Sequence, residues 1–254
     1  MNFSAIPARS LVGKLLRLPL RLLPARTCIP VLQGPLRGKR WIVGAGNHSC
    51  WLGCYETGKQ EQLRTLIRPG DTVYDLGANS GYFSLLCSLL TGPAGRVIAF
   101  EPLPANILLL NRHLSLNRIA NCTVVETAVS DREGTGSFLV TPNRSMGRLE
   151  AAGNNEPDSV PVRIVTLDGM VARGEIPPPA LIKCDVEGAE LNVLRGASMV
   201  LKTYHPTILI DMHRDDIQAE CGFLANLGYR LRTLDGLPLP ESGEILATWS
   251  AAPG

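Results

Sequence analysis

The sequence predicts an α/β fold in which a mostly parallel, seven-stranded sheet carries helices on both faces and a small β insertion. Three observations support this prediction. Strand-like and helix-like segments alternate from Asp71 onward, the strand-like segments are short and apolar, and a glycine-rich turn follows the first of them. Such alternation is typical of parallel sheets, whose strands are joined by helical crossovers. A chain of 254 residues is long enough for one domain of this kind with a terminal extension.

The expected elements follow in order along the chain. The strands of the main sheet are residues 72–76, 96–100, 122–129, 181–186, 206–212, 229–234 and 245–249. The intervening helices are residues 82–90, 104–117, 189–201 and 217–227. In the second of these helices, apolar side chains recur three and four residues apart and a proline occupies the first turn, both as expected for a helix. The insertion is a hairpin of residues 134–140 and 160–165, and the polar residues 143–159 are expected to form a loop.

Residues 1–40 are expected to form a basic extension, and residues 41–254 the domain itself. No acid precedes Glu56, and basic residues interrupt every apolar stretch before it. From this pattern we expect neither a signal-peptide core nor a membrane-spanning helix in the segment. A weak contact with a membrane surface or a partner is one interpretation. We favour a short helix packed on the domain, because Pro19 and Pro24 interrupt so short a segment.

Charge and cysteine content limit the partners and the compartment. The formal net charge of +2 and the absence of a broad basic, aromatic patch in the domain predict no nucleic-acid partner. The seven cysteines are odd in number, scattered and free of CxxC pairs, which predicts neither a zinc site nor a disulfide framework. We therefore expect a cytoplasmic protein, with at most a peripheral contact at the inner face of the membrane. The oligomeric state is left open.

The segment with the clearest chemistry is the glycine-rich turn Asp75-Leu-Gly77-Ala-Asn79-Ser-Gly81. It follows a strand and opens a helix, so its glycines let the backbone approach a ligand closely. Asp75 stands where a dehydrogenase would have the first glycine of GxGxxG. A carboxylate at this place repels a pyrophosphate but suits the ammonium and sulfonium groups of S-adenosylmethionine. The turn therefore favours S-adenosylmethionine over a nicotinamide dinucleotide.

Acids at the ends of the next two strands extend this site. Glu101 ends the second strand about 20 residues beyond the turn, where an acid accepts hydrogen bonds from ribose hydroxyls. Asp131 follows the third strand. We expect it either to face the adenine amino group or to be a structural turn residue.

The fourth strand ends in Lys183-Cys-Asp185-Val-Glu187. Strand alternation places Lys183 and Asp185 on one face of the sheet. A lysine buried in a central strand needs a partner, and Asp185 or Asp75 can supply the charge. Asp185 is expected at the crevice that holds the ligand. Glu187 either lies there too or is a charge that stabilises a helix N-terminus.

These segments resemble the FkbM-type family of S-adenosylmethionine-dependent methyltransferases. The matching segments are residues 75–82, 97–102, 128–131 and 182–190, together with 51–56 and 194–197. The resemblance covers roughly residues 50–215. It implies a Rossmann-like class I methyltransferase fold, S-adenosylmethionine as cofactor, and O-methylation of a carbohydrate or secondary metabolite, and hence a small-molecule or glycan acceptor. The expected cofactor residues are Glu56, Asp75, Gly77, Asn79, Gly81, Glu101, Pro102, Ser130, Asp131 and Asp185.

Transfer of a methyl group to a hydroxyl usually needs a base. The expected catalytic residues are Asp185 and His213, the latter because it follows the fifth strand at the same edge of the sheet. His48 is a weaker alternative, and His205 is expected to be structural. A metal-assisted route through Asp185, Glu187 and Asp211 suits oxygen ligands, but nothing in the spacing requires it, and no metal is expected.

Two further interpretations stay open. The chain is either an active enzyme or a non-catalytic module that binds S-adenosylmethionine, since the turn and its acids indicate binding alone. The basic extension also allows a peripheral membrane protein associated with glycans.

Overall fold

The computed structural model describes residues 24–140, 147–150, 159–186, 188–212, 217–235, 237 and 243–250. The short helix expected before residue 24, Glu187 and the candidate base His213 lie outside these ranges.

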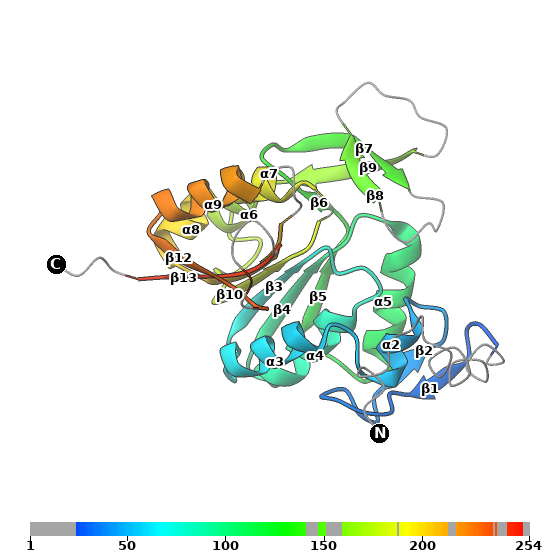
Figure 1. The fold of residues 1–254 in the computed structure, drawn as a ribbon. Coiled ribbons are helices and arrows are strands. Elements are labelled where there is room, and N and C mark those ends of the chain that lie inside the picture. Colours follow the sequence, from blue (N-terminus) through cyan, green and yellow to red (C-terminus); the bar gives the residue numbers. More distant parts are fainter. Residues whose placement is uncertain are drawn as a thin grey trace.

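One seven-stranded sheet forms the centre of the described molecule, in the order β12-β13-β11-β10-β3-β4-β5 (Figure 1). Its parallel strands are β3 (Thr72–Leu76), β4 (Arg96–Phe100), β5 (Cys122–Val125), β10 (Leu181–Cys184) and β11 (Thr207–Asp211). The antiparallel strands β12 (Tyr229–Thr233) and β13 (Glu244–Trp249) complete one edge. The predicted α/β fold is confirmed. Strand order reverses between β3 and β10, and sheets of this kind bind ligands beyond the strand ends at such a point.

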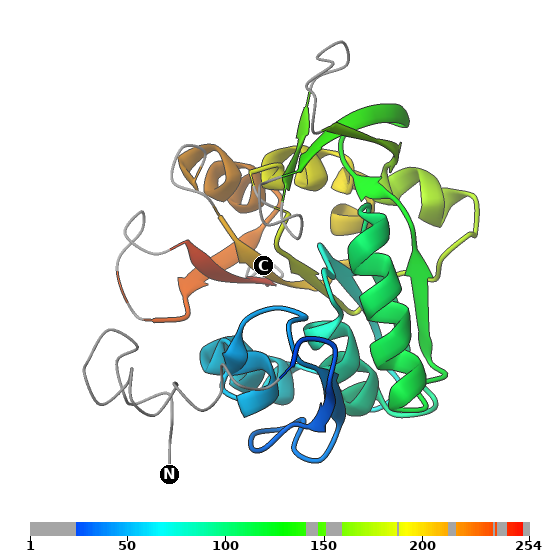
Figure 2. The ribbon, with the colours of Figure 1, turned by 90° about the vertical axis from the view of Figure 1, so that its right-hand side faces the viewer.

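Helices cover both faces of the sheet (Figures 1 and 2). On one face lie α2 (His48–Leu52), α3 (Thr57–Leu66), α4 (Tyr82–Thr91) and α5 (Pro104–Leu116). On the other lie α6 (Leu167–Ala172), α7 (Glu190–Arg195), α8 (Ser198–Tyr204) and α9 (Ile217–Asn226). Alternating strand residues supply the two cores: Leu181 packs with the first group and Ile182 with the second. The same alternation puts three polar side chains on the Leu181 side of the sheet, where they face α3 and α4. These are Asp75, Lys183 and Asp211.

The predicted third strand, residues 122–129, is wrong as one element. β5 ends at Val125 in a tight turn, where the Thr127 N–H donates to the Val125 carbonyl at 2.9 Å. The next strand, β6 (Ala128–Val129), leaves the main sheet and pairs in parallel with β9 (Ser159–Val165). Asp131 therefore does not follow a strand of the central sheet.

The predicted β insertion is confirmed as a four-stranded sheet of order β6-β9-β7-β8. In it, β7 (Gly134–Val140) pairs with both β8 (Gly147–Glu150) and β9. The loop expected over residues 143–159 is wrong in part, because it contains β8 and the first residue of β9. The rest of that segment lies outside the described residues.

The helix predicted over residues 189–201 is two helices, α7 and α8, separated at Gly196 and Ala197. A side chain at Gly196 would meet the Ser130 carbonyl oxygen at 2.0 Å, so the chain passes against the end of β6 there. Asp168, from the start of α6, accepts hydrogen bonds from the Met199 and Val200 N–H groups at 3.0 and 2.8 Å. The Asp168 carboxylate thus accepts from backbone N–H groups that the first turn of α8 leaves without a helical partner, and this stabilises the break between α7 and α8.

Residues between Pro24 and Gly44 pack on the domain. β1 (Cys28–Pro30) pairs with β2 (Arg40–Ile42), and Leu36 and Trp41 are fully buried in the core that contains α4. The division placed after residue 40 stays a prediction. Within the described ranges, no helix has the length and apolar character needed to cross a membrane. The predicted cytoplasmic location and the membrane contact also stay predictions.

His113 on α5 joins this N-terminal segment to the glycine-rich turn. Its Nε2 accepts the Ile42 N–H at 3.0 Å, its Nδ1 lies 2.7 Å from the Ser80 carbonyl oxygen, and its ring stacks on Trp41 at 3.8 Å. An Nε2 that accepts and an Nδ1 that donates require the neutral imidazole. The side chain is fully buried, and this burial lowers the pKa of His113 to about 4.

We expect His113 to make the fold less stable as the pH falls from about 6.5 toward 4. The unfolded chain protonates this imidazole near pH 6.5, whereas the folded protein holds its pKa at about 4. Between these values the unfolded state binds more protons, which costs about 3 kcal/mol of unfolding free energy by pH 4. Urea unfolding of the native protein and of His113→Gln at several pH values checks this. Since the other titrating groups are common to both proteins, the same pH slope in both would contradict the prediction.

Candidate cofactor and active site

A cavity of about 630 Å³ lies at the carboxyl ends of β3, β4 and β10. This volume is within the usual range for small-molecule sites. The turn after β3, the end of β4, the residues after β5, the end of β10 and the loop around Gly46 all contribute to its walls. Of the predicted cofactor residues, those that line the cavity are Gly77, Asn79, Glu101, Pro102 and Asp185.

The glycine-rich turn is held by its neighbours in a conformation that favours glycine. Gly77 has φ +74°, and a Cβ there would lie 1.9 Å from the Asp185 carbonyl oxygen. Gly81 has φ +89°, and a Cβ there would lie 2.3 Å from Leu110 Cδ1 on α5. Gly81 does not line the cavity. The turn therefore packs closely between the end of β10 and α5, and its glycines permit that packing because they have no Cβ.

Glu101 is tied to the same turn. One carboxylate oxygen accepts the Asn79 N–H at 2.7 Å, and the other accepts the Leu103 N–H at 3.0 Å and the Asn106 amide at 3.1 Å. Burial raises the pKa of Glu101, while these hydrogen bonds oppose the shift. The side chain is thus fixed in position and still lines the cavity.

Beyond β5, the structure places Thr127 on the cavity wall in place of the predicted Ser130 and Asp131. Thr127 is 3% exposed, and its hydroxyl has no hydrogen-bond partner among the described residues. Ser130 is buried but does not line the cavity, and Asp131 is exposed, 3.9 Å from Arg132. Sequence reasoning missed Thr127 because it took residues 122–129 as one strand. The signal was a hydroxyl residue near the end of an apolar strand.

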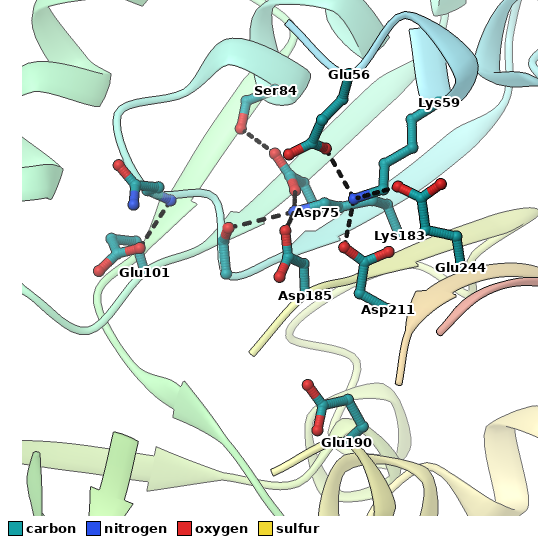
Figure 3. Close-up of polar contacts among 12 residues, drawn as sticks. Glu56, Lys59, Asp75, Ser84, Glu101, Lys183, Asp185, Glu190, Asp211 and Glu244 are labelled. Carbon is teal, nitrogen blue, oxygen red and sulfur yellow. Dashed lines mark hydrogen bonds and ion pairs between the residues drawn. The ribbon is translucent and has the colours of Figure 1, made fainter. Parts of the chain in front are cut away.

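At the centre of the sheet, Lys183 joins the cavity to the buried acid of β3. It lies beside Asp75 in the parallel register, and its ammonium is 3.3 Å from Asp75 Oδ1 and 3.7 Å from Asp185 Oδ2 (Figure 3). The predicted pairing is confirmed with both partners. Asp75 is fully buried, does not line the cavity, and accepts the Ser84 hydroxyl at 2.6 Å. Although burial opposes it, Asp75 and Asp185 raise the pKa of Lys183 above its usual value.

A second buried lysine forms ion pairs with three carboxylates beside Asp185. Lys59 on α3 is 2.7 Å from Glu56, 3.6 Å from Glu244 on β13, and directly bonded to Asp211 at the end of β11 (Figure 3). We call these four residues the Lys59 cluster. Sequence reasoning placed Glu56 at the border of the site but missed Lys59 and Glu244. The helix that carries Lys59 was not predicted, and no local pattern relates Glu244 to residues so far away in the chain.

The carboxylates of this region repel one another. Oxygens of Glu56, Asp185 and Asp211 lie within 4.8 Å of each other, close enough to hold a cation. The Lys59 ammonium already bonds to two of these groups. Burial, followed by repulsion from Asp185, raises the pKa of Asp211 to about 6, and Lys59 opposes the shift.

Two of the three histidines considered from the sequence are described in the structure, and both make structural contacts. His48 Nδ1 accepts the Trp51 indole N–H at 3.3 Å, and His48 does not line the cavity. His205 stacks on Trp249 at 3.7 Å, which supports the predicted structural role. His213 stays a candidate from sequence alone.

The sheet order, the glycine-rich turn and the acid that ends β4 together define a Rossmann-like class I methyltransferase fold. A sequence profile described as the Methyltransferase FkbM domain matches residues 75–231, more than half of the chain. The chain therefore belongs to the FkbM methyltransferase family. This membership confirms the predicted family and supports S-adenosylmethionine as the cofactor.

Similar proteins agree with this assignment. Hexuronic acid methyltransferase AglP of Haloferax volcanii is 29% identical over 161 residues, which cover 61% of this chain and 63% of that protein. The 31-O-demethyl-FK506 methyltransferase FkbM of Streptomyces tacrolimicus is 30% identical over 159 residues, 51% of this chain and 60% of that one. These matches thus span less than two thirds of either relative. The solved structure of an S-adenosylmethionine-dependent O-methyltransferase from Thermotoga maritima is 14% identical to this chain. The match covers 93% of this chain and 82% of that one with a TM-score of 0.53, which shows that the two share a fold.

Proposed function

We propose that the protein transfers the methyl group of S-adenosylmethionine to a hydroxyl oxygen of a carbohydrate or secondary metabolite. The observation that carries the proposal is Glu101, which accepts a hydrogen bond from the glycine-rich turn and lines a cavity at the point where the strand order reverses. The two relatives named above, one for a hexuronic acid and one for an O-demethylated natural product, support this class of acceptor.

The residues of the cavity fit this cofactor. The Glu101 carboxylate can accept from ribose hydroxyls, and the unpartnered Thr127 hydroxyl suits a polar edge such as that of adenine. Phe100 and Val129 add apolar wall beside them. Asp185 supplies negative charge for the cationic end of the ligand. We propose Glu101, Thr127, Asp185 and the backbone of the turn as the groups that hold the cofactor.

When bound, the cofactor supplies an electrophilic methyl group. The chain then has to orient the acceptor oxygen, exclude water and take up its proton. Asp185 is our candidate for the last step, because its carboxylate lines the cavity, is 24% exposed, and is paired with Lys183. His213, two residues beyond the end of β11, is the second candidate, on its sequence position alone.

Calorimetric titration with S-adenosylmethionine and S-adenosylhomocysteine tests the first half of the proposal. We expect both ligands to bind, and Glu101→Gln to weaken both by about tenfold to a hundredfold, because charge-assisted hydrogen bonds to the ribose are lost. The control variant is Glu126→Gln, which changes an exposed carboxylate after the neighbouring strand, β5. It should bind both ligands as tightly as the native protein does. Absence of binding by folded native protein would refute the proposal.

Methyl transfer to a panel of sugars and polyketide alcohols, followed by mass spectrometry, tests the second half. We expect methylation of a hydroxyl, and a strong loss of rate in Asp185→Asn. Cofactor binding without transfer to any acceptor would favour the non-catalytic binding module.

A further inference from the structure

We propose that Lys183 is a cofactor-binding residue whose ammonium binds the α-carboxylate of the methionine end of S-adenosylmethionine. This inference rests on the proposed function and adds a residue to it. The case combines the position of Lys183 in the sheet, the spare bonding capacity of its ammonium, and the charges around it.

The position of Lys183 is set by the fold. β10 and β3 are the two strands between which the strand order reverses, and Lys183 lies beside Asp75 across them. Its side chain is only 4% exposed, yet it lines the cavity together with Gly77. The small exposed part of this lysine is therefore inside the proposed cofactor site.

The contacts of Lys183 leave its ammonium incompletely bonded. Its nearest oxygens are the Gly77 carbonyl at 3.3 Å, Asp75 Oδ1 at 3.3 Å and Asp185 Oδ2 at 3.7 Å. A charge-assisted hydrogen bond from nitrogen to a carboxylate is about 2.7–2.9 Å long, so all three contacts are longer than such a bond. An ammonium has three donors, and this one retains capacity for another oxygen.

Lys59 provides an internal comparison for the same type of side chain. It is equally buried, it does not line the cavity, and it makes short bonds to Glu56 and Asp211. That is the arrangement expected of a lysine that only neutralises acids. Lys183 differs from it in both respects, since it borders the cavity and has no short bond to a carboxylate.

The charges at this place complement the ligand. Asp75 and Asp185 carry two negative charges, and Lys183 between them carries one positive charge. The methionine end of S-adenosylmethionine has two positive groups, the ammonium and the sulfonium, and one negative carboxylate. A site with acids alone would repel that carboxylate, whereas Lys183 offers it the one cation among the described cavity-lining residues.

The test is a binding cycle with two ligands and two proteins. The ligands are S-adenosylhomocysteine and its decarboxylated analogue, which retains the amine but lacks the α-carboxylate. The proteins are the native chain and Lys183→Gln, with the exposed change Lys202→Gln as the matched control. We expect removal of the carboxylate to weaken binding to the native chain and to Lys202→Gln by about tenfold or more, and to have less than a twofold effect in Lys183→Gln.

Two results would overturn the inference alone. In one, the native chain binds both ligands with affinities within twofold of each other, which requires no folded variant to observe. In the other, carboxylate removal weakens binding equally in the native chain and in Lys183→Gln. Failure of the native chain to bind S-adenosylhomocysteine would instead overturn the proposed function, and this inference with it.

Discussion

Replacement of Gly77 by alanine is expected to abolish cofactor binding and to lower the free energy of unfolding by about 3 kcal/mol or more. The backbone there has φ +74°, a left-handed conformation that costs any residue with a Cβ. The added Cβ would also lie 1.9 Å from the Asp185 carbonyl oxygen, and a backbone atom cannot move aside as a flexible side chain can. Either β10 or the turn must shift, and both contribute walls to the cavity.

Gly70→Ala is the matched control for backbone strain. Gly70 has φ +94°, but a Cβ there would have no atom within 4 Å. This variant should lose only about 1 kcal/mol and keep its affinity for S-adenosylhomocysteine. Urea unfolding and calorimetric titration of both variants separate the two effects. If Gly77→Ala behaved like Gly70→Ala in both measurements, the close packing of the turn against β10 would be wrong.

Replacement of Lys59 by methionine is expected to destabilise the fold by about 3–5 kcal/mol. The lysine side chain is 3% exposed and neutralises Glu56, Asp211 and Glu244, so its loss leaves partly buried carboxylates without their cation. Arg64→Met is the control on the same helix, because Arg64 pairs with Glu61 at the surface, where both side chains are more than half exposed. We expect that change to alter stability by less than about 0.5 kcal/mol.

The pH dependence of the Lys59→Met variant provides a second measurement. The pKa of Asp211 is already raised to about 6, mainly by burial and by repulsion from Asp185. A group whose pKa is higher in the folded state contributes stability that is lost as the pH rises through that value. Without Lys59 this pKa should rise further, so the loss of stability should be larger at pH 8 than at pH 5. Equal losses at both pH values would show that the carboxylates do not depend on Lys59 for their charge balance.

The sequence was sufficient for the features that depend on neighbouring residues. Six strands of the main sheet and the helices α4, α5 and α9 follow from local apolar periodicity, whereas α2, α3 and α6 were not predicted. The turn after β3 follows from a strand, a run of glycines and a helix in succession. Strand-end geometry placed Gly77, Glu101 and Asp185 at the site, because the carboxyl ends of parallel strands meet at one edge of the sheet. The family resemblance added Asn79 and Pro102, which also line the cavity.

Tertiary structure alone decided the features that depend on residues far apart in the chain. The Asp168 carboxylate caps the first turn of α8, some 30 positions later in the chain, and so stabilises the break between α7 and α8. A tight turn at Thr127 takes β6 into a second sheet and so removes Asp131 from the cavity wall. Lys59 meets Asp211 across 152 positions. Local patterns contain the chemistry of these side chains but not their distances, since strand register and helix packing set those distances only when the whole core closes.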